Sequence, residues 1–206
     1  MKKIIFFIIA ILSWTVSMQA ANPADAIVDS TVKTYKSSKG ISANYIITAA
    51  GTQSNGSIAM KGEKFRMISD DVKCWFNGKI QWSYSPMSGE VNITEPTPEE
   101  LQMINPYSII SGFRHGFNAR MLKSATASNH EIELLPKNAK QSDLASVRLT
   151  INKKTMLPNK IVFLLKDKTT MMITLNNYKT NQNLPNSTFE FNGGMVPKGT
   201  PVVDIR

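Results

Sequence analysis

The chain has 206 residues and a formal net charge of +9, because 24 Lys and Arg residues outnumber 15 Asp and Glu residues. This length can bury the core of one sizeable domain, and the single cysteine, Cys74, excludes an internal disulfide. The positive charge suggests an acidic partner, such as nucleic acid, an anionic lipid or an acidic protein patch. The lysines are scattered rather than clustered, which argues against a nucleic-acid partner.

The first twenty residues have the pattern of a secretory signal. Lys2 and Lys3 precede an apolar run from Ile4 to Leu12, and Ala20 stands at the expected cleavage position. The run is shorter than the ~20 apolar residues that a membrane-spanning helix needs. We therefore expect residues 1–20 to be a cleaved signal peptide and residues 21–206 to form a single exported domain. Export makes nucleic acid a still weaker candidate as a partner.

A helix is predicted after the signal. In the segment Asn22-Pro23-Ala24-Asp25, the Asn caps free N–H groups, the Pro suits the first helical position, and the Asp favours the positive end of the helix dipole. Apolar residues then recur at helical spacing, and Gly40 is a suitable end. The apolar face consists of Ile27, Val28, Thr31, Val32 and Tyr35.

From Ile41 the apolar period changes to two, which is typical of strands. The Gly51–Gly56 segment is predicted as a turn, and Asn77-Gly78 carries the signal of a tight hairpin. Phe65 and Met67 share one strand face, and Trp82 and Tyr84 share one face of a later strand.

The strand pattern breaks in the middle of the chain. Thr97-Pro98-Glu99-Glu100 forms a capping box that begins a short helix, and Asn105-Pro106 ends that helix and starts another. These two short helices lie between strand-rich halves, so we expect them to cover a sheet. The apolar residues of this cover are Leu101, Met103, Ile104, Ile109, Ile110 and Phe113.

The remaining chain again has the alternation of strands, and the pattern predicts about ten antiparallel strands in all. Phe189 and Phe191 alternate with Glu190, and Val202-Val203 is predicted as a short final strand. Few helices and no internal repeat favour a mainly β fold. We expect a strongly curved antiparallel sheet that forms an incomplete β-barrel.

Catalytic and metal-binding patterns are not found in the sequence. The only histidines, His115 and His130, lie outside any metal-ligand spacing, and no nucleophile elbow or phosphate-binding glycine loop occurs. Asp70-Asp71 is best interpreted as a solvated turn, and Cys74 as a small buried strand residue. We therefore predict no enzymatic activity, no cofactor and no metal. A catalytic site assembled from distant residues stays open as an alternative.

The order of these features resembles the outer-membrane lipoprotein carrier (LolA) family. The resemblance covers nearly the whole chain after the signal, and its motifs are specific through their order and spacing. They are Gly56 to Lys61, Phe65, the hairpin from Asn77-Gly78 through Trp82 and Tyr84 to Pro86, Asn105-Pro106, Leu135-Pro136-Lys137, Pro158-Asn159-Lys160-Ile161, Phe189-Glu190-Phe191, Pro197-Lys198-Gly199 and Val203-Asp204.

This resemblance implies a periplasmic carrier without covalent chemistry. Family members receive lipid-modified proteins from an inner-membrane transporter, shield the acyl chains in a hydrophobic cavity, and deliver them to an outer-membrane acceptor. A monomer fits a carrier with one mouth. Acyl chains cost ~0.8 kcal/mol per CH₂ when they are exposed to water, so transit requires a dry container.

The resemblance also implies a ligand cavity between the sheet and a helical lid. We predict that Phe65, Met67, Trp82 and Tyr84 line the concave face, and that Ile27 and Val28 face the cavity from the first helix. The inner side of the lid is predicted to consist of Ile104, Ile109, Ile110 and Phe113.

One position departs from the family pattern. Proteobacterial members carry an Arg-Pro pair before the Phe-containing strand, and that Arg helps to hold the lid closed. Gly62 stands near the place of that Arg, with Lys61, Lys64 and Arg66 as neighbouring substitutes. Two alternative functions therefore stay open: a carrier of free lipids or glycolipids, and an envelope-stress sensor domain of the same fold that binds a partner protein.

Overall fold

The computed structural model describes residues 22–98, 100–101 and 106–206, with the backbone alone for 106, 107 and 109. The predicted signal peptide over residues 1–20 and the predicted lid residue Ile104 lie outside these residues.

The N-terminal helix α1 (Pro23–Ser37) begins as the sequence predicts. The side-chain oxygen of Asn22 accepts a hydrogen bond from the backbone N–H of Ala24 at 3.0 Å, and Pro23 occupies the first turn. The helix ends at Ser37, before Gly40. Its buried side is formed by Ala24, Val28, Thr31 and Tyr35.

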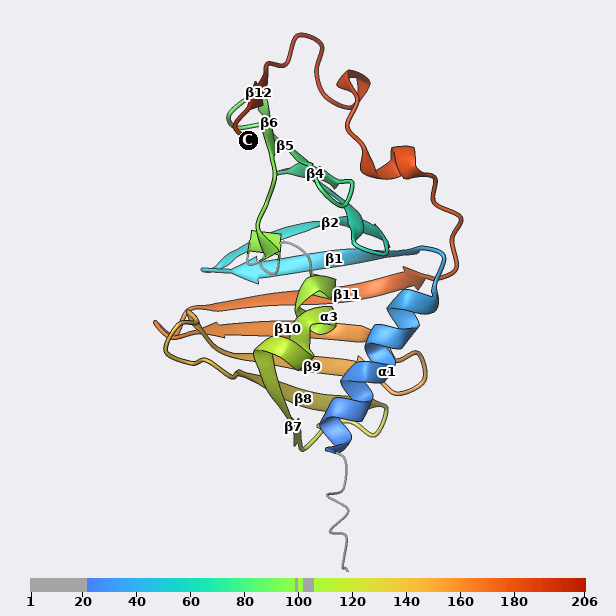
Figure 1. Cartoon of the computed structure of the whole chain (residues 1–206), viewed down its shortest axis with the longest axis vertical. Helices are drawn as coiled ribbons and strands as arrows, with labels where there is room; N and C mark the ends of the chain where they lie inside the picture. The colour runs from blue at the N-terminus through green and yellow to red at the C-terminus, as the bar shows by residue number, and fades with distance from the viewer. Residues whose placement is uncertain (1–21, 99, 102–105) are drawn as a thin grey trace, which may run out of the picture.

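A single twelve-stranded sheet forms the body of the molecule (Figure 1). Its strands are β1 (Ile41–Ala49), β2 (Thr52–Lys61), β3 (Lys64–Ser69), β4 (Lys73–Phe76), β5 (Gln81–Ser85), β6 (Glu90–Thr94), β7 (Phe117–Leu122), β8 (Asn129–Pro136), β9 (Leu144–Asn152), β10 (Pro158–Leu165), β11 (Thr170–Lys179) and β12 (Val202–Asp204). They are ordered β12-β6-β5-β4-β3-β2-β1-β11-β10-β9-β8-β7, so β12 and β7 are the two open edges. All neighbours pair antiparallel except β12, which lies parallel to β6. The prediction of a curved, unclosed antiparallel sheet is confirmed.

The two described helices lie on the same face of this sheet. Figure 1 shows α1 and α3 (Pro106–Gly116) crossing in front of the strands, and α1 contacts both α3 and β7. The main hydrophobic core lies between these helices and the sheet. We call this side of the sheet the covered face.

Turn chemistry accounts for the predicted Asn-Gly hairpin. Between β4 and β5, the side-chain oxygen of Asn77 accepts hydrogen bonds from the backbone N–H groups of Lys79 and Ile80, and Gly78 has φ +101°, a conformation that favours glycine. The turn predicted over Gly51–Gly56 was too long, because β2 already begins at Thr52. The first half of β2 is polar, so no apolar alternation marks it as a strand.

A C-terminal strap, residues 180–201, lies against the opposite face of the sheet. Its Phe191 ring lies 5.5 Å from that of Trp75, and Phe189 is fully buried. This strap closes a second hydrophobic cluster that consists of Ile68, Trp75, Trp82, Tyr84, Val91, Phe191, Met195 and Val196. The alternation of Phe189 and Phe191 does not mark a strand, because Phe189 ends the 3₁₀ helix η1 (Asn186–Phe189) and Phe191 precedes the 3₁₀ helix η2 (Gly193–Met195).

Candidate functional site

A continuous row of side chains crosses the covered face from β1 to β6. Residues that pair across neighbouring strands project from the same face. The row consists of Ile41, Met60, Phe65, Phe76, Gln81 and Thr94, each paired with the next. Its first four members are buried and apolar, and the Phe65 and Phe76 rings are 5.3 Å apart. The row therefore changes from apolar to polar as it approaches β6.

Two of the predicted cavity residues on the sheet occupy this face, and two do not. Phe65 and Met67 are buried in the main core. Trp82 pairs with Trp75, whose neighbour in β4, Phe76, belongs to the covered face, so Trp82 and Tyr84 project from the opposite face. There they pack beneath the C-terminal strap in the second cluster. The prediction that Trp82 and Tyr84 share the concave face with Phe65 was therefore wrong.

The helices place further predicted residues against the same core. Val28 of α1 is fully buried there, and Ile27 is partly buried against it. On α3, Ile110 and Phe113 are buried in the same core, while the side chain of Ile109 lies outside the described residues. A ligand-binding role for these residues stays a prediction, as it does for Phe65 and Met67.

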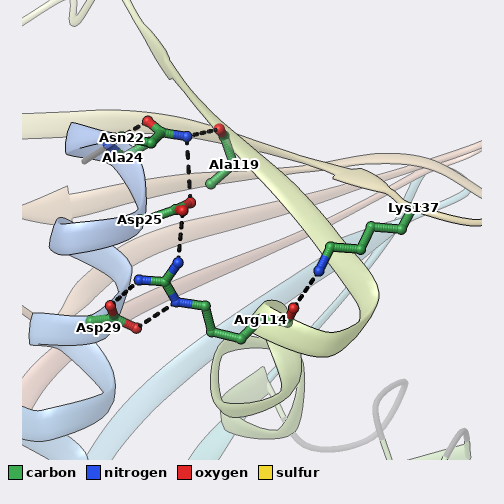
Figure 2. A network of polar contacts seen from close by, with 7 residues as sticks. All are labelled: Asn22, Ala24, Asp25, Asp29, Arg114, Ala119 and Lys137. Atoms are coloured by element: carbon green, nitrogen blue, oxygen red, sulfur yellow. Dashed lines mark hydrogen bonds and ion pairs between the residues drawn. The ribbon is translucent and has the colours of Figure 1, made fainter. Parts of the chain in front are cut away.

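The two helices are fastened together by Arg114, the residue that follows Phe113 on α3 (Figure 2). Its guanidinium donates to Asp25 Oδ2 at 2.7 Å, and to Asp29 Oδ1 at 3.2 Å together with a second bond to Asp29 Oδ2. The hydrogen bond to Asp29 is the main cause of the raised pKa of Arg114. We call these three residues the helix clamp.

The helix clamp is extended at both ends. Asn22 at the start of α1 donates to the backbone oxygen of Ala119 in β7 at 2.6 Å, and Lys137 donates to the backbone oxygen of Arg114. The start of α1, the end of α3 and the β7 edge are therefore one polar network (Figure 2).

Among the described residues, the cations near Gly62 have partners other than α1 and α3. Gly62 lies in the β2–β3 turn, where an added Cβ would meet no atom within 4 Å. The ammonium groups of Lys61 and Lys64 bind the C-terminal strap, at Leu184 O (2.8 Å) and Asn186 Oδ1 (3.2 Å). Arg66 pairs with Trp75 and projects from the opposite face. Within the described part of the chain, the ion pairs that join the helices are those of the helix clamp.

Two cavities open at the polar end of the row, near β5 and β6. The first, which we call the mouth pocket, has a volume of about 440 Å³, within the ~300–1,000 Å³ of small-molecule sites. It is lined by Glu63, Phe76, Gly78, Lys79, Glu95, Pro96, Pro98, Leu101, Ser108, Ser111 and Gly112. The second, the edge pocket, has about 540 Å³ and is lined by Gln81, Thr94, Glu95, Pro96, Glu100, Ile205 and Arg206. Glu95 and Pro96 border both pockets.

Three features of the described residues bear on their chemistry. No group of three His, Cys, Asp or Glu side chains within them is placed to hold a metal ion. Burial raises the pKa of the Cys74 thiol to about 12, so the thiol stays protonated at neutral pH. None of the described helices is long and apolar enough to cross a membrane.

The family model of the outer-membrane lipoprotein carrier protein LolA matches residues 14–166, well over half of the chain. The chain belongs to the LolA family. No curated protein matches it.

Solved structures share the fold of this LolA family member at low sequence identity. An uncharacterised conserved protein from Thermus thermophilus has a TM-score of 0.61 at 14 % identity, over 88 % of this chain and 98 % of that one. A DUF1329 family protein from Desulfovibrio piger has a TM-score of 0.50 at 12 % identity, over 85 % and 100 %. MucB, seen in complex with MucA in a structure from Pseudomonas aeruginosa, has a TM-score of 0.50 at 11 % identity, over 82 % and 63 %.

Sequence reasoning missed the helix clamp and the polar end of the row. Asp25 and Asp29 are four residues apart and therefore share one side of α1, which marks an acidic stripe. Their partner Arg114 is 85 residues beyond Asp29, so only the fold reveals it. Gln81 gave no signal, because its place next to Trp82 indicates the solvent-facing side of its strand.

Proposed function

We propose that this protein is a periplasmic carrier, which holds the acyl chains of lipoproteins between the sheet and the helices and ferries them from the inner to the outer membrane. The observation that carries the proposal is the mouth pocket, which shares Phe76 with the buried apolar row and is bordered by α3. An acyl chain entering there leaves water at a gain of ~0.8 kcal/mol per CH₂. Membership of the LolA family and the predicted signal peptide support the same reading.

Loading requires the covered face to open. In the structure the apolar row is occupied by the protein's own side chains, including Met60 and Met67. Methionine is flexible and adapts to irregular shapes, so these residues suit a surface that exchanges self-packing for ligand packing. The α1–α3 layer must move away from the sheet for a whole acyl chain to enter. Binding then needs no covalent step, and release follows when an acceptor binds the chains more tightly.

The proposed partners follow from this route. An inner-membrane lipoprotein-releasing transporter would supply the cargo, and an outer-membrane acceptor would receive it from the monomeric carrier. The free lipid or glycolipid carrier and the sensor domain that binds a partner protein are the other outcomes that the experiments below distinguish.

The first experiment is mass spectrometry of the protein purified from the periplasm, under native conditions and after organic extraction. We expect acylated lipoproteins in stoichiometric amount. Recovery of free phospholipid or glycolipid would support a lipid-binding cavity but identify a cargo other than lipoproteins. Purified protein that is empty, and that also fails to bind a fluorescent fatty-acid probe, would contradict the carrier function and favour the sensor.

A pair of glycine variants tests the location of the site. Gly112 borders the mouth pocket, Gly116 on the same helix does not, and a Cβ added at either position meets no atom within 4 Å. We expect Gly112→Trp to block the mouth, and exclusion of even two CH₂ groups weakens binding about tenfold. Gly116→Trp is the matched control and should leave probe binding unchanged. Equal affinities in the two variants would show that acyl chains do not enter at the mouth pocket.

A further inference from the structure

In the described part of the chain, two polar atoms at the end of the apolar row are buried without a hydrogen-bond partner. These are Gln81 Oε1 and Thr94 Oγ1, and the two residues pair directly across β5 and β6. Gln81 exposes only 8 % of its surface. Among the described residues just one other buried side-chain atom is unpaired, Trp75 Nε1 in the second cluster. A buried polar group without a partner destabilises the fold, so this pair needs an explanation other than stability.

The position of the pair points to a ligand. Both residues line the edge pocket, which borders the mouth pocket through Glu95 and Pro96. Phe76, the neighbour of Gln81 in the row, lines the mouth pocket. A molecule that occupies both spaces would meet apolar surface at one end and unpaired polar atoms at the other. An amphipathic molecule has that distribution of chemistry.

The charged groups around the edge pocket already have partners. Arg206 Nε donates to Asp204 Oδ1 at 2.8 Å, and Lys79 lies 3.8 Å from Glu95. The Glu100 carboxylate accepts hydrogen bonds from the backbone and hydroxyl of Thr97 at 2.8 and 3.0 Å, in a capping box. What stays open is an amide oxygen, which accepts hydrogen bonds, and a hydroxyl, which donates and accepts. This pair favours a neutral donor over an anionic head group.

We propose that Gln81 and Thr94 form a head-group subsite, which accepts a hydrogen bond from a neutral hydroxyl or amide N–H next to the acyl chain of the ligand. This inference rests on the proposed function, since the acyl chain occupies the mouth pocket. The donor has two sources of the same chemistry: the hydroxyl of a monoacylglycerol, or the N–H of an N-acylated amine such as an acylated protein terminus. The subsite would recognise the chemical group that joins the acyl chain to its head group, while the apolar row would bind acyl chains of any length.

The experiment compares three palmitoyl ligands by displacement of a fluorescent fatty-acid probe from the whole chain without its signal. Monopalmitoylglycerol carries hydroxyl donors, N-methylpalmitamide carries an amide N–H and no hydroxyl, and methyl palmitate carries no donor. We expect the two donor ligands to bind roughly three- to tenfold more tightly than methyl palmitate, the effect of one buried hydrogen bond. The tighter of the two identifies the preferred source of the donor.

Substitution of the subsite tests the same inference from the protein side. In Gln81→Leu, or in Gln81→Leu combined with Thr94→Val, the three ligands should bind equally, at the affinity that the wild-type protein has for methyl palmitate. Because the substitution removes an unpaired buried group, Tm should not fall, and a rise of about 2–4 °C is expected. Gln53→Leu, at an exposed position of β2, is the matched control and should keep the donor preference.

Three results would overturn the subsite. Equal binding of all three ligands by the wild-type protein would show that the head group is not read, while the carrier function stands. A lower Tm in Gln81→Leu would mean that Gln81 supports the fold instead. If no palmitoyl ligand displaces the probe and the probe itself fails to bind, the proposed function is lost together with the subsite.

Discussion

If α3 is a lid, it must open without the sheet unfolding, and two buried phenylalanines can test this. Phe113 lies on the inner side of α3 and Phe163 on β10, and both are almost completely buried in the same core. Phe→Ala in a core costs about 3–5 kcal/mol. This value agrees with the ~150–250 Å² that a buried aromatic side chain removes from water at ~25 cal/mol per Å². For a domain of this size, Tm should fall by roughly 6–20 °C in either variant.

Native-state hydrogen exchange separates the two variants. Phe113→Ala weakens the closed lid, so amides of α3 should exchange about a hundredfold faster or more, at tenfold per 1.4 kcal/mol. Phe163→Ala destabilises the sheet equally in the open and the closed state of the lid, so the equilibrium between these states does not change. Amides of β9 and β10 should therefore exchange faster, while the amides of α3 keep their wild-type exchange rate. If Phe163→Ala accelerates α3 as much as β9, then α3 opens only when the whole domain unfolds, and the lid reasoning is wrong.

Three further predictions concern charge and the thiol. Arg114→Gln should speed exchange in α3 at low salt, and the difference from wild type should shrink near 1 M salt, where the Debye length is ~3 Å; a difference independent of salt would contradict an electrostatic clamp. Burial raises the pKa of Glu133, but hydrogen bonds from Arg120 and Arg148 lower it more, so its pKa is below the ordinary 4.5. The stabilisation from ionised Glu133 is complete above that value and is lost as pH falls through the lower folded pKa. Urea titrations should therefore show that the free energy of unfolding falls more steeply with acid in wild type than in Glu133→Gln, a variant that is ~1–3 kcal/mol less stable at pH 7. Parallel acid profiles of the two proteins would contradict this role of Glu133. Cys74, whose pKa is about 12, should not react with a thiol reagent at pH 8 until urea unfolds the chain, and rapid labelling of the native protein would disprove its burial.

Local chemistry made the ends of elements predictable. The side chain of Asn22 caps α1, Asn77 closes the β4–β5 hairpin, and Thr97 and Glu100 form the capping box that their spacing indicates. Each of these interactions joins residues no more than three apart, so the sequence contains all that determines them.

The face of a strand was less predictable, because alternation fixes two faces without saying which one is covered. In β4 the neighbours Trp75 and Phe76 are both buried, one on each side of the sheet. Both sides are apolar there since the helices cover one and the C-terminal strap covers the other. The strap comes more than a hundred residues after β4, which is why the alternation around Trp82 predicts the wrong side.

The order of strands has a consequence for the synthesis of this protein. β1 pairs with β2 on one side and with β11 on the other, in a register that joins Ser42 to Lys179. Until β11 is available, the β1 edge presents unpaired backbone groups in the middle of the future sheet, and such an edge invites pairing with other chains. Pairing between strands so far apart in the sequence is also intrinsically slow. The nascent chain therefore exposes an aggregation-prone edge during most of its synthesis. A chain that is truncated before Thr170 lacks β11 and would never cover this edge.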